Sequence, residues 1–180
     1  LCCAGLTTYR AVKKIVPYLE PDDYVAIVGV GGLGVYAAQW LKTLAPHVNT
    51  VFVDIRDQAI EFASKIVKPY AVVNVSKEEP IQALYRVSKN LGIKAVLDFV
   101  GTENTINTYA NVLSKCGIYV VVGMMGNKIT ITPLRPFVVN EKTLTGVLTG
   151  TLSEFYEVVT LAKRGMVDYA SVVSRRFNLE

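Results

Sequence analysis

Four glycines within six residues follow a short apolar segment, and this cluster constrains the fold more than any other feature. Tyr24–Val28 is apolar, and Gly29–Gly34 then reads GVGGLG, which fits G-x-G-x-x-G. The pattern of Gly32–Leu44 predicts a helix that ends before Pro46. Asp54 lies 20 residues beyond the last of these glycines, where a second apolar segment ends. A strand, a tight turn, a helix and an acid after the next strand together indicate a dinucleotide-binding unit.

Each position in this loop suits a particular task. Gly29 permits the tight turn, Gly31 lets the backbone approach a pyrophosphate, and Gly34 lets the helix pack against the strand. Free N–H groups near Gly32 and Leu33, together with the helix dipole, favour negative charge. The alternative is that the glycines only form a tight turn. A Walker A loop is excluded, because no Lys-Ser/Thr pair follows the glycines.

The acid after the second strand indicates which nucleotide is bound. A carboxylate at Asp54 accepts hydrogen bonds from the adenosine ribose hydroxyls and repels a 2′-phosphate, so it favours NAD over NADP. Arg56 weakens this preference, because an arginine two residues further on is able to meet a phosphate. The alternative is that Asp54 only ends a strand. A methyltransferase also uses a glycine-rich first loop and an acid after the second strand, but the number of strands favours a dinucleotide.

Short Val/Ile-rich segments alternate with amphipathic ones along the whole chain. Apolar strands between helices predict an α/β fold, a doubly wound six-stranded parallel sheet of the Rossmann type. The predicted strands are Tyr24–Val28, Thr50–Val53, Tyr70–Asn74, Lys94–Asp98, Gly117–Val122 and Leu144–Leu148. The predicted helices are Ala4–Val16, Gly32–Leu44, Asp57–Val67, Pro80–Asn90, Glu103–Leu113 and Ser153–Arg164. Ile129–Thr132 alternates Ile and Thr, which is typical of an exposed or edge strand.

The length and composition set further limits. One such sheet uses nearly all 180 residues, so we expect residues 1–180 to form a single NAD-binding domain without a separate substrate domain. The charge of +4 is small and scattered, which argues against nucleic acid. Tyr24–Leu41 carries no charge, but its central glycines favour a strand and a helix over a membrane span. Three cysteines without a CxxC pair fit a reducing, cytoplasmic setting.

Three segments together carry a family resemblance. LCCAGLTTY at the start, the GVGGLG loop and VFVDIRD resemble the medium-chain zinc-dependent alcohol dehydrogenases, and the archaeal, thermophile-type branch is the most similar. The resemblance extends to the helix near Phe155–Arg164 and covers the coenzyme domain of that family, not its catalytic domain. It implies NAD as cofactor, zinc in the full-length enzyme and a small alcohol or carbonyl substrate. The chain begins at Leu1 without a signal-peptide pattern, and we expect it to be a fragment.

The resemblance also assigns roles to individual residues. Cys3 is implied as a zinc ligand, effective only with the missing domain, and no catalytic residue is expected within this chain. The implied cofactor contacts outside the glycine loop are Thr7 at the nicotinamide ribose, Phe99 and Val100 on the adenosine side, and Val122, Gly123, Met124, Val147 and Thr149 at the nicotinamide end. Ile129–Thr132 resembles the edge strand through which subunits pair, so a homo-oligomer is expected. Cys2 and Cys116 are predicted to be buried apolar residues, and His47 to lie in a surface loop.

Other functions compete with this one. Short-chain dehydrogenases use Tyr-x-x-x-Lys, and Tyr9–Lys13 and Tyr85–Lys89 match that spacing. The first pair precedes the glycine loop and the second lies too soon after it, so both are interpreted as coincidences. A stand-alone nucleotide-sensing module remains open. A zinc-free, quinone-reductase-like relative is disfavoured by Cys3, because that group usually lacks a cysteine there.

Overall fold

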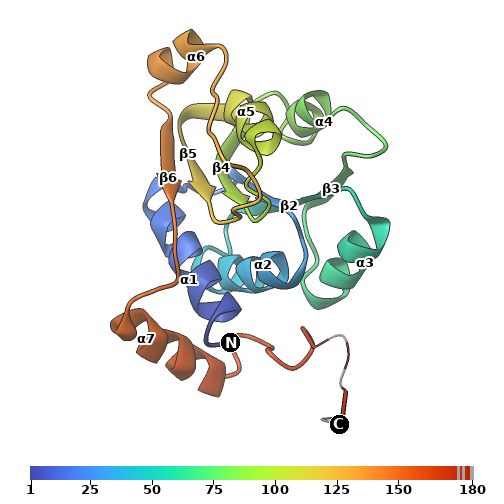
Figure 1. Ribbon diagram of the computed structural model, residues 1–180, viewed down its shortest axis with the longest axis vertical. Coiled ribbons are helices and arrows are strands. Elements are labelled where there is room, and N and C mark those ends of the chain that lie inside the picture. Colours follow the sequence, from blue (N-terminus) through green and yellow to red (C-terminus); the bar gives the residue numbers. More distant parts are fainter. Residues whose placement is uncertain (174, 176, 179–180) are drawn as a thin grey trace.

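The computed structural model describes residues 1–173, 175 and 177–178. Six parallel strands form one sheet in the order β3-β2-β1-β4-β5-β6, with helices on both faces (Figure 1). The strands are β1 (Tyr24–Val28), β2 (Asn49–Asp54), β3 (Ala71–Asn74), β4 (Ile93–Asp98), β5 (Leu113–Val121) and β6 (Thr143–Gly146). The helices are α1 (Ala4–Ile15), α2 (Gly32–Leu44), α3 (Asp57–Ile66), α4 (Pro80–Val87), α5 (Glu103–Asn111), α6 (Leu134–Val139) and α7 (Leu152–Lys163), with a 3₁₀ turn at Val16–Tyr18. The predicted doubly wound fold is therefore confirmed.

The alternation of side chains along β1 explains why helices cover both faces of the sheet. Val25 and Ile27 join a core cluster with α1, α2, α3 and α7, whereas Tyr24, Ala26 and Val28 join a second cluster with α4 and α5. Every residue of β1 is buried. Because successive side chains of a strand point to opposite faces, a central strand in a two-sided sheet must be apolar throughout.

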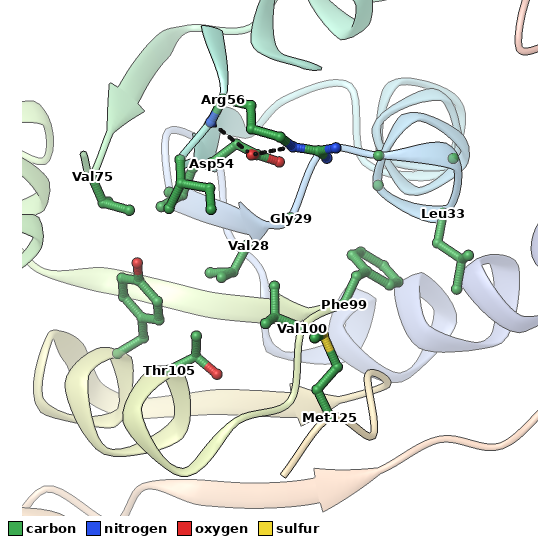
Figure 2. A pocket seen from close by; sticks show the side chains of 16 residues that line it. Val28, Gly29, Leu33, Asp54, Arg56, Val75, Phe99, Val100, Thr105 and Met125 are labelled. Atoms are coloured by element: carbon green, nitrogen blue, oxygen red, sulfur yellow. Dashed lines mark hydrogen bonds and ion pairs between the residues drawn. The ribbon is translucent and has the colours of Figure 1, made fainter. Parts of the chain in front are cut away.

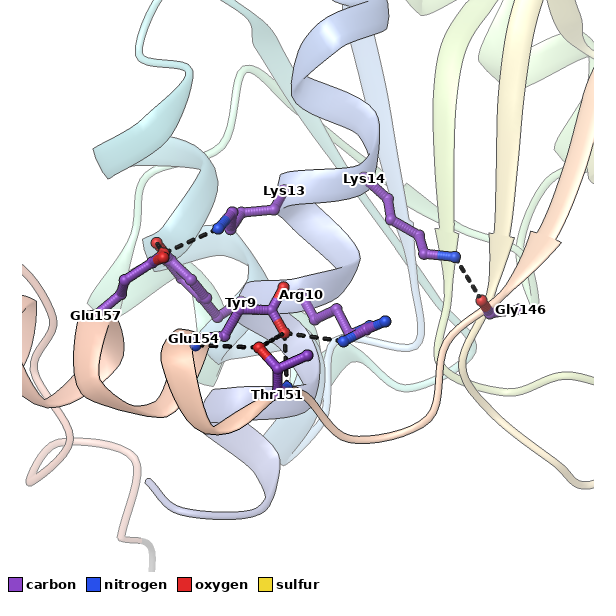
Figure 3. A network of polar contacts seen from close by, with 8 residues as sticks. All are labelled: Tyr9, Arg10, Lys13, Lys14, Gly146, Thr151, Glu154 and Glu157. Atoms are coloured by element: carbon purple, nitrogen blue, oxygen red, sulfur yellow. Dashed lines mark hydrogen bonds and ion pairs between the residues drawn. The ribbon is translucent and has the colours of Figure 1, made fainter.

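The N-terminal helix α1 is fixed to both α2 and α7. On the side facing α2, the buried Trp40 indole donates to the carbonyl of Gly5 at 2.9 Å. Facing α7, the Tyr9 hydroxyl and the Lys13 ammonium both donate to Glu157 (Figure 3). Arg10 forms an ion pair with Glu154 of the same helix. These contacts fix the position of α1, and with it the position of Cys2 and Cys3 in the turn before this helix.

The segment Ile129–Thr132 does not form the predicted edge strand. Side chains of α5 form hydrogen bonds with its backbone instead. Asn107 accepts from the Thr132 N–H at 2.8 Å, and Asn111 donates to the Thr132 carbonyl at 2.9 Å. Thr130 also donates to the carboxylate of Glu103. The edge of the sheet on this side is β6, and the short helix α6 between the segment and β6 was not predicted.

Two predicted boundaries and two predicted burials are also wrong. Helix α4 ends at Val87, because Lys89 and Asn90 adopt positive φ values of 52° and 66°. Strand β5 begins before Gly117, and Cys116 within it has a φ of 54°. Cys116 is exposed, as is Cys2, so neither is the buried apolar residue that was expected. Within the described ranges, no helix is both long and apolar enough to cross a membrane.

Candidate functional site

A cavity of about 580 Å³ lies at the carboxyl ends of β1, β2 and β4 (Figure 2). In a parallel sheet wound in both directions, this edge beside the central strand is where ligands bind. Val75 and Thr105 lie at one end of the cavity, and Leu33 and Phe99 lie at the other. The lining consists of Val28, Gly29, Gly31, Gly32, Leu33, Gly34, Val53, Asp54, Ile55, Arg56, Val75, Phe99, Val100, Thr105, Tyr109 and Met125.

The glycines of the loop fall into two groups. Gly29 has a φ of 83°, and a Cβ at Gly34 would lie 2.3 Å from the carbonyl oxygen of Gly29, so both positions require glycine for the fold itself. A Cβ at Gly31 would approach only the Arg56 guanidinium, at 3.8 Å, and one at Gly32 would meet nothing within 4 Å. The protein alone thus leaves space above Gly31 and Gly32, and this space belongs to the cavity.

The first turn of α2 faces this space without a side-chain cap. Gly31 is the N-cap residue and offers no side-chain acceptor, and the first turn contains no acidic residue. The opening N–H groups of a helix have no intrahelical partner, and the helix dipole adds partial positive charge there. Gly32 and Leu33, which open the helix, also line the cavity. The geometry therefore suits an anionic group such as a pyrophosphate.

Asp54, the last residue of β2, has a buried carboxylate beside the loop. One oxygen accepts from the backbone N–H of Val30 at 3.0 Å, and the other accepts from the backbone N–H of Arg56 at 3.0 Å. Asp54 therefore has a structural role that the sequence did not reveal, because it fixes the turn between β1 and α2. Since each carboxylate oxygen can accept more than one hydrogen bond, acceptor capacity remains for a ligand in the cavity.

Arg56 follows β2 by two residues, lines the cavity and extends toward the glycine loop (Figure 2). Its Nε lies 3.4 Å from Asp54, and its side chain is 65% exposed. Such an exposed pair contributes little to stability. The guanidinium is thus free to turn toward a phosphate at little energetic cost.

The β4–α5 connection forms the opposite wall. Asp98 is fully buried at the end of β4 and accepts from the backbone N–H groups of Val100 and Gly101 at 2.8 and 2.9 Å. Its other oxygen accepts from the hydroxyls of Thr105 and Tyr119 at 2.8 and 2.9 Å. Four hydrogen bonds hold the carboxylate, so the loop that carries Phe99 and Val100 has a fixed position.

The structure brings nine of the predicted cofactor residues together in this cavity. They are Gly29, Gly31, Gly32, Leu33, Gly34, Asp54, Arg56, Phe99 and Val100. Six others do not line it, namely Thr7, Val122, Gly123, Met124, Val147 and Thr149. Met124 is 80% exposed, and its neighbour Met125 lines the cavity instead. A Cβ at Gly123 would lie 2.3 Å from the Val100 carbonyl carbon, so packing between two loops already explains that glycine.

Sequence reasoning missed the residues that complete the apolar wall. Val28 ends β1, Val53 is the penultimate residue of β2, and Val75 follows β3; these positions at the carboxyl ends of strands were the available signal. Thr105 and Tyr109 lie one turn apart on α5, so both present their side chains to one face of that helix. No motif distinguished them from ordinary core residues.

Thr7 and Cys3 lie near the start of α1. Thr7 is buried, and its hydroxyl has no hydrogen-bond partner in the described part of the chain, whereas the adjacent Thr8 donates to Ala4 and Gly5. Cys3 is exposed at the position preceding α1. The described residues contain no group of three His, Cys, Asp or Glu able to hold a metal. Cys3 therefore cannot form a zinc site with the described residues of this chain alone.

Comparison with known proteins finds a family model and several relatives that match this chain. The family model described as "Zinc-binding dehydrogenase" matches residues 32–164. The chain is 35% identical over 182 residues to an NAD-dependent alcohol dehydrogenase of Sulfurisphaera tokodaii, covering 100% of this chain and 50% of that protein. An NAD-dependent alcohol dehydrogenase of Saccharolobus solfataricus is 36% identical over 169 residues, covering 93% and 47% of the two chains.

A solved structure shows the same arrangement. The alcohol dehydrogenase of Aeropyrum pernix superimposes with a TM-score of 0.83 at 34% identity, over 91% of this chain and 46% of that one. The chain therefore spans about half the length of the relatives that it matches. The family match covers the glycine loop from Gly32, Asp54 at the end of β2 and most of the sheet. The chain belongs to the zinc-binding dehydrogenase family.

Proposed function

We propose that this chain is the NAD(H)-binding domain of a zinc-dependent alcohol dehydrogenase. The observation that carries the proposal is the open space above Gly31 and Gly32, between an uncapped helix start and the Asp54 carboxylate. Glycine at those two positions has no explanation in the packing of the protein. It is explained when a pyrophosphate lies against the backbone. The bound nicotinamide supplies the hydride acceptor, and this chain supplies its position.

Each part of the cavity matches one part of the adenosine half of the cofactor. The N–H groups that open α2 bind the pyrophosphate, and the free lone pairs of Asp54 accept from the ribose hydroxyls. Val53 and Val75 offer an apolar surface to the base. The proposed contacts thus follow the cofactor from the pyrophosphate to the base along the ends of β1, β2 and β4.

The nicotinamide half is assigned to the residues outside this cavity. Thr7, whose hydroxyl has no partner among the described residues, lies at the nicotinamide ribose, and the backbone groups of Val122, Gly123 and Met124 meet the carboxamide. Val147 and Thr149 take a similar part after β6. Thr7 lies in α1, and the other residues lie beyond the carboxyl ends of β5 and β6, the sheet edge where ligands bind in this type of fold.

The rest of the enzyme follows from the family. In the whole protein we propose hydride transfer between an alcohol and its aldehyde or ketone, with Cys3 as one zinc ligand and the others outside this chain. We also propose that residues 1–180 form one domain, that the enzyme is cytoplasmic, and that the surface at Ile129–Thr132 contacts a second copy. The exposed Ile129 and the apolar face of α6 next to this segment support that contact.

Binding without turnover is the expected behaviour of this chain. Calorimetric titration is expected to show NAD and NADH binding, and a spectrophotometric assay with added zinc is expected to show no alcohol oxidation. Absence of binding to either nucleotide contradicts the cofactor assignment. Measured turnover by this polypeptide alone contradicts the assignment of the chemistry to a second domain.

Asp54→Ala tests the ribose contact. We expect the variant to lose more affinity for NAD than for NADP, because the carboxylate binds the ribose hydroxyls but repels the 2′-phosphate. The ratio of the two dissociation constants is the readout, since the loss of the Val30 contact affects both nucleotides equally. An equal loss for both nucleotides contradicts the role of Asp54 at the ribose.

A further inference from the structure

One polar side chain that lines the cavity, away from the glycine loop, has no hydrogen-bond partner among the described residues. Among the lining residues, only Asp54, Arg56, Thr105 and Tyr109 have polar side chains. The first two lie beside the glycine loop. Thr105 donates to Asp98 at 2.8 Å and accepts from the Thr102 N–H at 3.0 Å, so its hydroxyl is already occupied.

Tyr109 differs from Thr105 in this respect. The residue is only 4% exposed, and its ring packs in the core cluster with Val28 and Val53. Its hydroxyl has no hydrogen-bond partner in the described part of the chain, yet no described polar atom is both fully buried and unpaired. The hydroxyl oxygen therefore keeps some accessible surface, and Tyr109 lines the cavity. Buried tyrosine hydroxyls normally have a partner, so this one points to a ligand.

The surrounding charge indicates which ligand group is favoured. Burial and then the charges of Asp98, Glu79 and Asp54 raise the pKa of Tyr109, so the hydroxyl keeps its proton at neutral pH. Three carboxylates near one phenol create a negative potential at its oxygen. A ligand group that donates a hydrogen bond is stabilised in such a field, whereas a carbonyl oxygen is repelled.

We propose that Tyr109 determines base specificity by accepting a hydrogen bond from the 6-amino group of the adenine ring. This inference depends on the proposed function, because it assumes that the adenosine half of NAD occupies the cavity. In this arrangement Val53 and Val75 contact the faces of the base and the Tyr109 hydroxyl meets its polar edge. A few well-placed polar groups in an apolar pocket are what fix the orientation of a ligand.

The test combines one side-chain change with one cofactor change. Affinity is measured by calorimetry for NAD and for nicotinamide purine dinucleotide, which lacks the 6-amino group, with the unmodified chain and with Tyr109→Phe. The unmodified chain is expected to prefer NAD by about three- to tenfold, the range expected for one hydrogen bond. Tyr109→Phe is expected to bind NAD more weakly by the same factor and to bind both dinucleotides equally.

Tyr36→Phe is the matched control. Tyr36 is also buried, lacks a hydroxyl partner in the part of the chain that the structure describes, and does not line the cavity. Its variant is expected to bind NAD as the unmodified chain does. The proposal is overturned if Tyr109→Phe retains full NAD affinity, or if it loses the same factor for both dinucleotides. Failure of the unmodified chain to bind NAD contradicts the proposed function instead, so the two failures are distinguishable.

Discussion

The two halves of the ligand-binding edge of the sheet differ in how completely this chain builds them. At the ends of β1, β2 and β4 the chain encloses a cavity with its own loops and helices. At the ends of β5 and β6 the side chains of Met124 and Leu148 are 80% and 78% exposed. The half at β1, β2 and β4 is built by contacts between neighbouring βαβ units. The half at β5 and β6 leaves apolar side chains exposed. In the proposed function, the adenosine subsite is thus complete within the described part of this chain, and the nicotinamide subsite is not.

The largest effect is expected from Gly34→Ala. Its Cβ would lie 2.3 Å from the Gly29 carbonyl oxygen, which is backbone and cannot rotate away. We expect a loss of about 3 kcal/mol in the free energy of unfolding, as in overpacked cores. Urea denaturation followed by circular dichroism measures it. A change below about 0.5 kcal/mol would show that the glycine loop is not tightly packed.

Gly32→Ala is the matched change in the same loop, and its effect is expected on binding alone. Nothing lies within 4 Å of the added Cβ, so the free energy of unfolding is expected to stay within about 0.5 kcal/mol. NAD affinity is expected to fall at least about tenfold, because the methyl group occupies the space assigned to the pyrophosphate. Unchanged affinity would place the pyrophosphate elsewhere.

A smaller effect is expected from Glu157→Gln, at the contact between α1 and α7. The hydrogen bond from Tyr9 and then the one from Lys13 lower the pKa of Glu157 in the folded protein. A lowered pKa adds stability above the unfolded-state pKa of about 4.3, and that stability is lost as pH falls through the folded pKa. We expect the variant to lose less than about 1 kcal/mol at pH 7, because the pair is partly exposed.

The pH dependence separates this contact from a general effect of charge. The difference between Glu157→Gln and the unmodified chain is expected to shrink when urea denaturation is repeated at a pH below the folded pKa of Glu157. Glu61→Gln, an exposed change on α3, is the matched control for the loss of one surface negative charge. A difference that stays constant with pH would contradict the role of the Glu157 charge.

The smallest effect is expected in the open half. Met124→Ser and Leu148→Ser each remove a side chain that has little contact with the rest of the chain. The free energy of unfolding is expected to change by no more than about 0.5 kcal/mol in thermal or urea denaturation. A loss of 2 kcal/mol or more would mean that this chain itself covers these residues, and the contrast between the two halves would disappear.

The sequence predicted the features that depend on local geometry and missed those that depend on packing between distant elements. The glycine spacing and Asp54 located the cavity, because these residues act through local geometry that a short motif encodes. Tyr109 was missed because its role depends on how α5 packs across the sheet, and a helix-face tyrosine resembles any core residue. The alternation of Ile129–Thr132 predicted a strand, but Asn107 and Asn111 hold its backbone instead. Helix α6 was missed because Pro136 lies within it.

The cysteines show a further limit of sequence patterns. Cys116 lies within β5, and there the positive φ and the hydrogen bond from its N–H to the Asn140 carbonyl leave the side chain exposed. No composition rule distinguishes such a position from a buried one. Asp54 was located correctly, but its hydrogen bond to the Val30 N–H, which fixes the glycine turn, was visible only in three dimensions.

Titration with the two halves of the cofactor tests the central claim most directly. Calorimetry on this chain would compare NAD, adenosine 5′-diphosphoribose and nicotinamide mononucleotide. The adenosine compound is expected to bind within about tenfold of NAD, because the cavity at Asp54 and the glycine loop is complete, whereas nicotinamide mononucleotide is expected to give no detectable heat. Binding of nicotinamide mononucleotide without binding of the adenosine compound would contradict the account.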